Sequence, residues 1–230
     1  MPISLIALLI AMAGLVGSHL VLAHPLRAAL RRALGDTGFA IAYTLIAVIM
    51  VLAVLIAYHD APTGPRLWTA EHPVVQAGFC IASYVATVLL IASLSNNPGW
   101  IGTNLNGLST RMPGGAMLVT RHPAMFGIVL WSLAVLLLLP AWRNLITSGG
   151  FVVLALVGAQ GQDRKKRALA PREWGVWMTR TRFWPDLRQC GALGLAWVGA
   201  VVPWLVMVWV LTRIITVPLG PWYLFPELPY

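Results

Sequence analysis

Long apolar runs separated by short polar segments dominate the pattern along the chain. A helix needs about 20 mainly apolar residues to cross the roughly 30 Å hydrocarbon layer, where it satisfies its own backbone hydrogen bonds. The pattern therefore predicts an all-α, polytopic transmembrane helical bundle that forms one integral membrane domain over residues 1–230. The six runs that meet or nearly meet this length are Ile3–Ala23, Phe39–Tyr58, Val74–Leu94, Ala124–Pro140, Leu145–Gln160 and Gly191–Ile214. The first run lacks the basic segment of a signal peptide, so we expect it to be a retained span.

Composition agrees with this pattern, since 59% of the residues are hydrophobic and only 10% are charged. An ordinary soluble domain has roughly 45–50% and about 25%, so the composition excludes a water-soluble globule. The net charge of +9 does not indicate nucleic-acid binding, because the basic residues form no contiguous face on a solvated domain.

The basic residues instead predict the membrane topology. Most of the sixteen Lys and Arg side chains lie in the first, third and fifth loops, over residues 24–38, 95–121 and 161–190. The positive-inside rule then places these loops in the cytoplasm and both termini outside, which is the periplasm for a bacterial inner membrane. In that position the basic loops also face the anionic lipid headgroups of the cytoplasmic leaflet.

Two histidines fall at the same predicted depth. His19 lies near the cytoplasmic end of the first span, and His122 lies at the start of the fourth span, in Arg121-His122-Pro123. An imidazole within the apolar layer is costly unless it is bonded, so it indicates a functional site by default. Each ring could simply bond a neighbouring hydroxyl or carbonyl group. The alternative is that both rings are axial ligands of haem, which a helical bundle can enclose with apolar side chains. Arg121 could then bind a haem propionate, or it could extend to lipid phosphate.

An amphipathic surface segment is expected in the last cytoplasmic loop. Trp174 and Trp177 are three residues apart and share one face of a helix, with basic residues on the other face. This arrangement is typical of a helix that lies on the membrane surface with tryptophans in the lipid interface. A lid over the site near His122 is the alternative interpretation.

Several motifs together resemble the NnrU family. The resemblance covers about Leu15 to Pro185, with an additional span after it, and its most specific part is the histidine-proline motif. By this resemblance the protein would be an inner-membrane protein linked to nitric oxide and nitrite metabolism in denitrification, and related to plant 15-cis-zeta-carotene isomerase, which binds haem b. It implies a haem b bound by His19 and His122 with Arg121 beside it, and either the denitrification role or isomerisation of a hydrophobic polyene. The motifs are Gly17-Ser18-His19, Arg121-His122-Pro123-Ala124-Met125-Phe126-Gly127, Glu173-Trp174 and Thr181-Arg182-Phe183-Trp184-Pro185.

Two alternative functions remain open on the sequence. Arg121-His122-Pro123 followed by a basic loop that closes on Arg182-Phe183-Trp184-Pro185 is also similar to the isoprenylcysteine carboxyl methyltransferases, which use S-adenosylmethionine. Those enzymes usually carry adjacent acidic residues where this chain has Gln162-Asp163, so methyl transfer ranks second. The third possibility is a non-catalytic membrane scaffold or regulator of a partner enzyme.

Overall fold

The computed structural model describes residues 2–70, 72–100, 103–215 and 221–222, and every regular element in these ranges is helical. Five stretches are long and apolar enough to cross a membrane, and the shorter apolar helix α5 accompanies them. The prediction of a polytopic helical membrane protein is therefore confirmed. The five stretches are α1 (Ile3–Ala23), α2 (Arg27–Asp60), α3 (Pro73–Ala92), α6 (Trp142–Leu169) and Ala196–Arg213, which contains α8 (Ala196–Gly199) and most of α9 (Val201–Ile215). The remaining elements are α4 (Ala116–Val119), α5 (Pro123–Leu138), α7 (Pro171–Arg180) and the 3₁₀ helix η1 (Leu187–Leu193).

Proline marks the start of three helices. Pro73, Pro123 and Pro171 stand in the first turns of α3, α5 and α7. The missing N–H of proline costs nothing at this position, and its fixed φ angle suits a helix. The sequence motif Arg121-His122-Pro123 therefore begins α5 as predicted, with His122 at the N-cap position.

Three predicted spans differ from the observed helices. α2 begins at Arg27 rather than Phe39 and bends at Gly35, whose φ of 72° is accessible mainly to glycine. α6 continues to Leu169 rather than ending near Gln160, because residues 162–169 are polar but consist largely of good helix formers. The last span is interrupted at Gly194, where φ is 52°, so η1 precedes α8 and α9 in place of one continuous helix.

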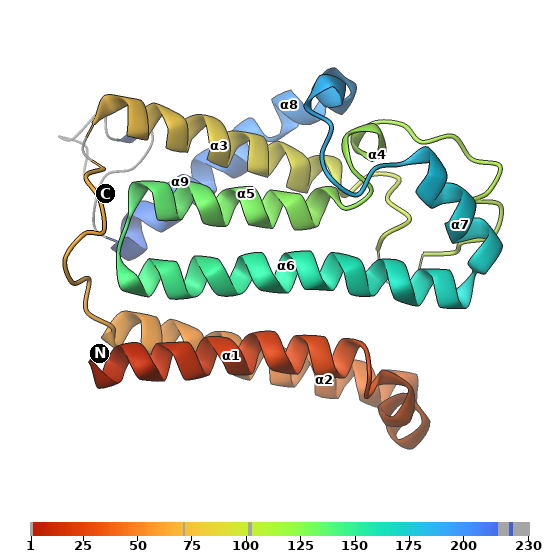
Figure 1. Ribbon diagram of the computed structural model, residues 1–230, viewed down its shortest axis with the longest axis horizontal. Helices are drawn as coiled ribbons and strands as arrows, with labels where there is room; N and C mark the ends of the chain where they lie inside the picture. Colours follow the sequence, from red (N-terminus) through yellow and green to blue (C-terminus); the bar gives the residue numbers. More distant parts are fainter. Residues whose placement is uncertain (1, 71, 101–102, 216–220, 223–230) are drawn as a thin grey trace.

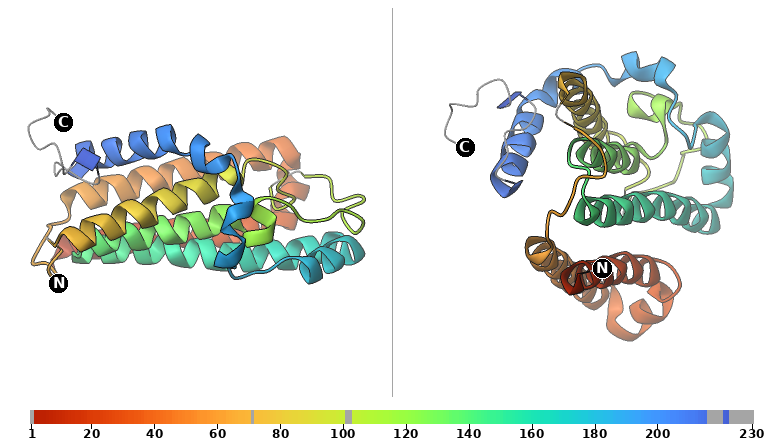
Figure 2. Two further views of the ribbon diagram at one scale, coloured as in Figure 1. Left: turned by 90° about the horizontal axis from the view of Figure 1, so that it is seen from above. Right: turned by 60° about the vertical axis from the view of Figure 1, so that its left-hand side comes forward.

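The long helices form a row in which neighbours in space are not always neighbours in sequence. α1 packs against α2 and α6, α6 packs against α5, and α5 packs against α3. α8 and α9 lie along the far side of α3 (Figures 1 and 2). α6 therefore lies between the α1–α2 hairpin and the rest of the molecule (Figure 1).

α5 approaches α3 most closely at Gly127. A Cβ atom on this glycine would lie 2.9 Å from the carbonyl oxygen of Ala86 and 2.9 Å from the side chain of Leu90. The absence of a side chain is thus what permits the close approach, as expected for small residues at interfaces between membrane helices.

The amphipathic helix α7 lies on the molecule at the end of α6, but its tryptophans do not face lipid. Trp174 and Trp177 are 0% and 1% exposed and belong to a core cluster with Val88, Met117 and Phe126. The expectation that these rings anchor the helix in the lipid interface is therefore wrong. Their apolar face is covered by protein, which the local sequence pattern cannot distinguish from lipid.

Candidate functional site

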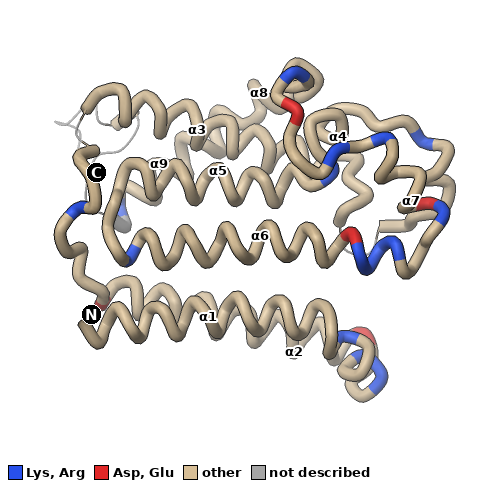
Figure 3. The backbone as a smooth tube through the Cα atoms, in the orientation of Figure 1, with Lys and Arg blue, Asp and Glu red and all other residues tan. Residues whose placement is uncertain are grey.

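Lys and Arg residues gather at one end of the bundle, which we call the basic end. Figure 3 shows them at the turn between α1 and α2, at the end of α6 and along α7 and the segments beside it. The start of α5 lies at the same end. All three predicted site residues, His19, Arg121 and His122, lie at or near this end.

Asp163 of α6 holds Arg121 and His122 together. One carboxylate oxygen, Oδ2, accepts a hydrogen bond from Nε of Arg121 at 2.8 Å and lies 2.7 Å from Nη2 of the same arginine in an ion pair. The other, Oδ1, lies 2.9 Å from Nε2 of His122. The three side chains are 9%, 1% and 10% exposed for Arg121, His122 and Asp163. A buried arginine needs such a partner, because an unpaired charge away from water is very costly. We call these residues the Arg–His–Asp cluster.

The loop after α7 closes over the Arg–His–Asp cluster. The backbone N–H of Arg121 donates to the carbonyl oxygen of Arg182 at 2.8 Å, and the hydroxyl of Thr120 donates to the carbonyl oxygen of Phe183 at 2.6 Å. The Phe183 ring packs against His122 and lies 5.3 Å from the guanidinium of Arg121. Two motifs about 60 residues apart in the chain therefore form one structural unit.

These bonds place a proton on Nε2 of His122. A carboxylate that binds arginine is ionised and can only accept, so Nε2 of His122 carries a proton and donates it. Nδ1 is then the only ring nitrogen with a free lone pair in the neutral imidazole. The cavity that His122 lines measures about 130 Å³ and is also lined by Trp100, Met125 and Gln162. Ligand pockets typically measure about 300–1,000 Å³, so this small cavity cannot enclose a porphyrin.

His19 lies on a larger cavity. Its Nδ1 donates to the carbonyl oxygen of Leu15 at 3.1 Å, and its ring stacks edge-on against Tyr43 at 5.5 Å. Because a carbonyl only accepts, Nδ1 carries the proton and Nε2 has the free lone pair. We call this space, of about 690 Å³, the interhelical cavity, and its walls come from α1, α2, α5 and α6.

Cations surround the interhelical cavity at the basic end. Arg27, Arg31 and Lys165 line it together with His24. Arg31 is paired with Asp36 at 2.6 Å, whereas Arg27 stacks on the ring of Phe39 at 5.3 Å. Burial lowers the pKa of His24, and the nearby charges of Lys165 and Arg27 lower it further, so its imidazole is neutral at pH 7.

The predicted pairing of His19 with His122 is not seen in this arrangement. The two histidines line different cavities. These cavities are neighbours, because Met125 and Gln162 line both of them. α6 lies between α1 and α5, which keeps the two helices apart (Figure 1). The nitrogen on the interhelical cavity that could hold a metal ion is Nε2 of His19. The free nitrogen of His122 is Nδ1, because its Nε2 is bonded to Asp163, and the cavity beside it measures only about 130 Å³.

A protein-family model described as "NnrU protein" matches residues 7–218. The chain belongs to the NnrU family. The match extends beyond the segment from Leu15 to Pro185 on which the sequence motifs rest, and it includes the last span. No curated protein and no solved structure matches the chain.

Sequence reasoning missed two buried polar residues of α6 in this NnrU protein. Asp163 appeared as one acid in a basic loop, and only the extension of α6 places it opposite Arg121 and His122. Lys166, one turn further, is 8% exposed and donates to the carbonyl oxygens of Pro98 and Trp100, with its ammonium over the Trp174 ring. The signal that could have revealed them is the uninterrupted run of helix formers up to Pro171.

Proposed function

We propose that this NnrU family protein binds haem b in the interhelical cavity, with His19 as an iron ligand, and that it acts in nitric oxide or nitrite metabolism. The observation that supports this most directly is the state of His19. Its Nδ1–H is bound to a backbone carbonyl, and its Nε2 is left for a ligand on a cavity of suitable size. Metal-binding histidines usually have this second hydrogen bond, which fixes both tautomer and ring orientation.

The other walls of the cavity suit an amphiphilic, anionic ligand. Phe39, Ile128, Phe151 and Leu154 provide apolar surface between the helices. At the basic end, Arg27 and Lys165 are placed to bind carboxylates, as the propionates of haem require. Arg121, which the sequence suggested for this role, is bound to Asp163 instead.

Bound haem would supply an iron that accepts a small diatomic ligand such as nitric oxide at an open coordination position. The residues of the chain hold the ligand, exclude water through the apolar walls and set the orientation of His19. The Arg–His–Asp cluster affects the interhelical cavity indirectly. It fixes the start of α5, and Met125 of this helix lines the cavity.

An absorption spectrum of the purified protein from haem-replete cells tests the proposal. We expect a Soret band in the wild type and its loss or a large decrease in His19→Ala. His59→Ala is the matched control, because His59 is exposed at the opposite end of the bundle, where its ring lies 3.3 Å from the carboxylate of the neighbouring Asp60. A colourless wild type, or equal spectra for both variants, would contradict haem binding through His19.

The variant His122→Asn separates one-histidine from two-histidine ligation. Asparagine keeps an N–H group that can donate to Asp163 but offers no imidazole to iron. We expect the position of the Soret band to be unchanged. A shift from a six-coordinate to a five-coordinate spectrum would instead establish His122 as the second axial ligand and would require Asp163 or the helices to rearrange.

The remaining alternatives have their own measurements. If the preparation contains no haem, calorimetry with S-adenosylmethionine tests the methyltransferase interpretation. If haem is present, conversion of a cis-polyene by the loaded protein distinguishes an isomerase from a protein that binds nitric oxide. Absence of all three activities would favour a scaffold or regulator.

A further inference from the structure

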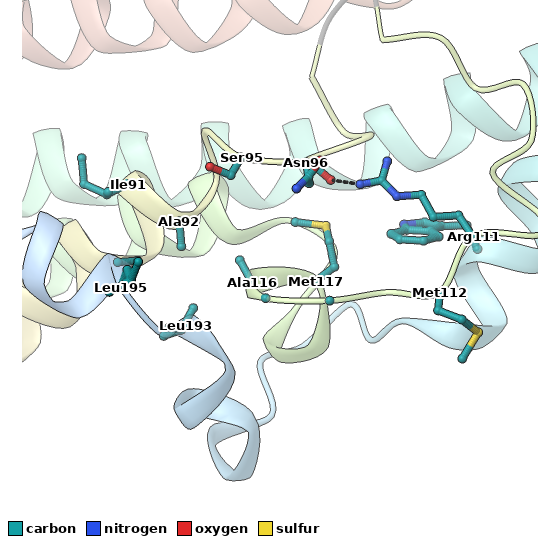
Figure 4. Close-up of a pocket in the computed structure, with 14 residues that line it drawn as sticks. Ile91, Ala92, Ser95, Asn96, Arg111, Met112, Ala116, Met117, Leu193 and Leu195 are labelled. Atoms are coloured by element: carbon teal, nitrogen blue, oxygen red, sulfur yellow. Dashed lines mark hydrogen bonds between the residues drawn. The ribbon is translucent and has the colours of Figure 1, made fainter.

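A second cavity, separate from the interhelical cavity, lies at the basic end between the last turn of α3 and the segments that carry α4, η1 and α8. It measures about 610 Å³. We call it the α4 cavity, and Figure 4 shows the residues that line it. It shares no lining residue with the interhelical cavity or with the small cavity beside His122. The residues that line it include Ile91, Asn96, Arg111, Met117, Trp177 and Leu193.

Trp177 gives the α4 cavity an unused hydrogen-bond donor. Its side chain is 1% exposed and lines the cavity, and its indole Nε1 has no hydrogen-bond partner among the residues that the structure describes. Buried polar groups are almost always hydrogen-bonded, because leaving one unpaired costs the full desolvation of that group. An acceptor atom of a bound molecule would satisfy this donor.

Arg111 gives the same cavity a cation without a counter-ion. Its Nη2 donates to the carbonyl oxygen of Asn96 at 3.2 Å, as Figure 4 shows, and within the described ranges it pairs with no carboxylate. Arg180 donates to the backbone carbonyl oxygen of Arg111 at 3.0 Å but does not itself line the cavity. The nearby acid Glu173 is already bound by the N–H and hydroxyl groups of Ser109. An arginine without a carboxylate partner and an indole donor favour an anion with several acceptor oxygens, such as phosphate.

The rest of the α4 cavity is apolar and leads outward. Ile91, Met117 and Leu193 form one wall, and Leu195 and Met112 also line the cavity while they are 87% and 72% exposed. Exposed apolar side chains of this kind are stable next to lipid chains. A ligand with a phosphate at Arg111 and methylene groups along this wall would therefore match both parts of the cavity.

We propose that the α4 cavity binds the phosphate headgroup of an anionic lipid, with Arg111 and the indole N–H of Trp177 as its polar contacts. Basic pockets between membrane helices on the cytoplasmic side bind lipid headgroups in this way. The acyl chains would leave past Leu195 toward the bilayer. This site does not depend on haem binding.

Native mass spectrometry of the protein released from nanodiscs tests the site. We expect one phosphatidylglycerol to be retained by the wild type from phosphatidylglycerol discs and none from phosphatidylcholine discs. Arg111→Gln should lose it, and Trp177→Phe, which keeps the ring but removes the N–H, should weaken retention about tenfold or more. Arg188→Gln is the matched control, because Arg188 is an exposed arginine at the same end and does not line the cavity.

The outcomes separate the site from general lipid adhesion. Equal retention by the wild type and Arg111→Gln, or equal retention of the two lipids, would overturn the proposal. Arg111 is exposed, so its substitution leaves the fold intact and the comparison remains valid. Glycerol phosphate added in excess identifies the source of the phosphate. If it displaces the lipid, the site also binds free phosphate esters, and if it does not, the acyl chains contribute to binding. Both results support the assigned residues.

Discussion

The α1–α2 hairpin and the α3–α5 pair are both built from apolar helices, but they are packed differently. In the hairpin region the glycines that approach another helix face the flexible ends of side chains, Met50 for Gly14 and Met12 for Gly150. In the α3–α5 pair, Gly127 faces a backbone carbonyl and a leucine. A methionine can adapt its rotamers, whereas a backbone carbonyl cannot move without shifting its helix.

This difference assigns separate roles to the two regions. The rigid pair ends in the Arg–His–Asp cluster, whose members are bonded to one another and closed off by the loop after α7. The adaptable hairpin forms two walls of the interhelical cavity and carries His19. A cavity that must admit a large ligand between helices is better placed beside the region that can move.

Among the substitutions that test this difference, Asp163→Ala should cause the largest loss of stability. It leaves the Arg121 guanidinium without its counter-ion and the Nε2–H group of His122 without its acceptor, and breaking such a buried pair typically costs about 3–5 kcal/mol. Asp36→Ala removes the acid from an exposed ion pair in the hairpin, where 73% of the Asp36 side chain is accessible. That change should have little effect on stability, because exposed ion pairs contribute little. Unfolding of both variants in detergent measures the difference, and equal losses would mean that the cluster is no more rigid than the hairpin.

Gly127→Ala should have the next largest effect. Its new methyl group would overlap the contact with Ala86 and Leu90, and overpacking of this kind typically costs about 1–3 kcal/mol. Gly17→Ala is the control in α1, because a Cβ atom there meets nothing within 4 Å. Alanine is also the better helix former, so Gly17→Ala should be neutral or stabilising by up to about 1 kcal/mol. Thermal unfolding of the two variants tests this expectation. A loss of stability in Gly17→Ala as large as that in Gly127→Ala would refute the difference in packing.

The sequence predicted the rigid side of the molecule better than its chemistry. Arg121-His122-Pro123 predicted the start of α5, because the preference of proline for the first turn of a helix is a property of a single residue. The partner of His122 could not be predicted, since Asp163 reaches it only because α6 continues beyond the apolar run. Apolar runs measure where lipid ends and not where a helix ends.

The tryptophans of α7 and His19 show a second reason why the sequence did not predict the site. The pattern that identifies α7 as amphipathic does not tell whether lipid or protein covers its apolar face, and here Trp174 and Trp177 lie in a protein core with residues of α3, α4 and α5. The place of His19 near the basic end was predictable from the charges of the loops. Its separation from His122 by α6 depends on which helices are neighbours, and hydrophobic pattern alone carries little information on this.

Gly161→Ala tests the adaptability of the hairpin side on its own. A Cβ atom on Gly161 would collide with the imidazole of His24, which lies at the end of a rotatable side chain. The imidazole can turn away, so the loss of stability should stay below about 1 kcal/mol, as for other changes that flexible side chains absorb. Because His24 lines the interhelical cavity, haem affinity should fall even so. Gly149→Ala, where a Cβ atom meets nothing within 4 Å, is the control in the same helix. A large loss of stability in Gly161→Ala without a change in the Soret band would contradict this assignment.

The smallest effect should be a pH dependence on the rigid side, at the contact between α7 and the loop before α4. The N–H and hydroxyl groups of Ser109 bind Glu173 and lower the pKa of its carboxyl group below its ordinary value of about 4.3. A lowered pKa means that this contact contributes its full stability above the ordinary value and loses it as the pH falls through the pKa of the folded state.

Hydrogen exchange of the peptide that contains Ser109 should therefore be slower in the wild type than in Glu173→Gln at pH 7, and the difference should disappear toward pH 3. Asp60→Asn, an exposed acid at the opposite end, should leave this peptide unchanged at every pH. If the difference between wild type and Glu173→Gln persists at pH 3, the geometry of the side chain and not the charge of Glu173 holds α7 in place.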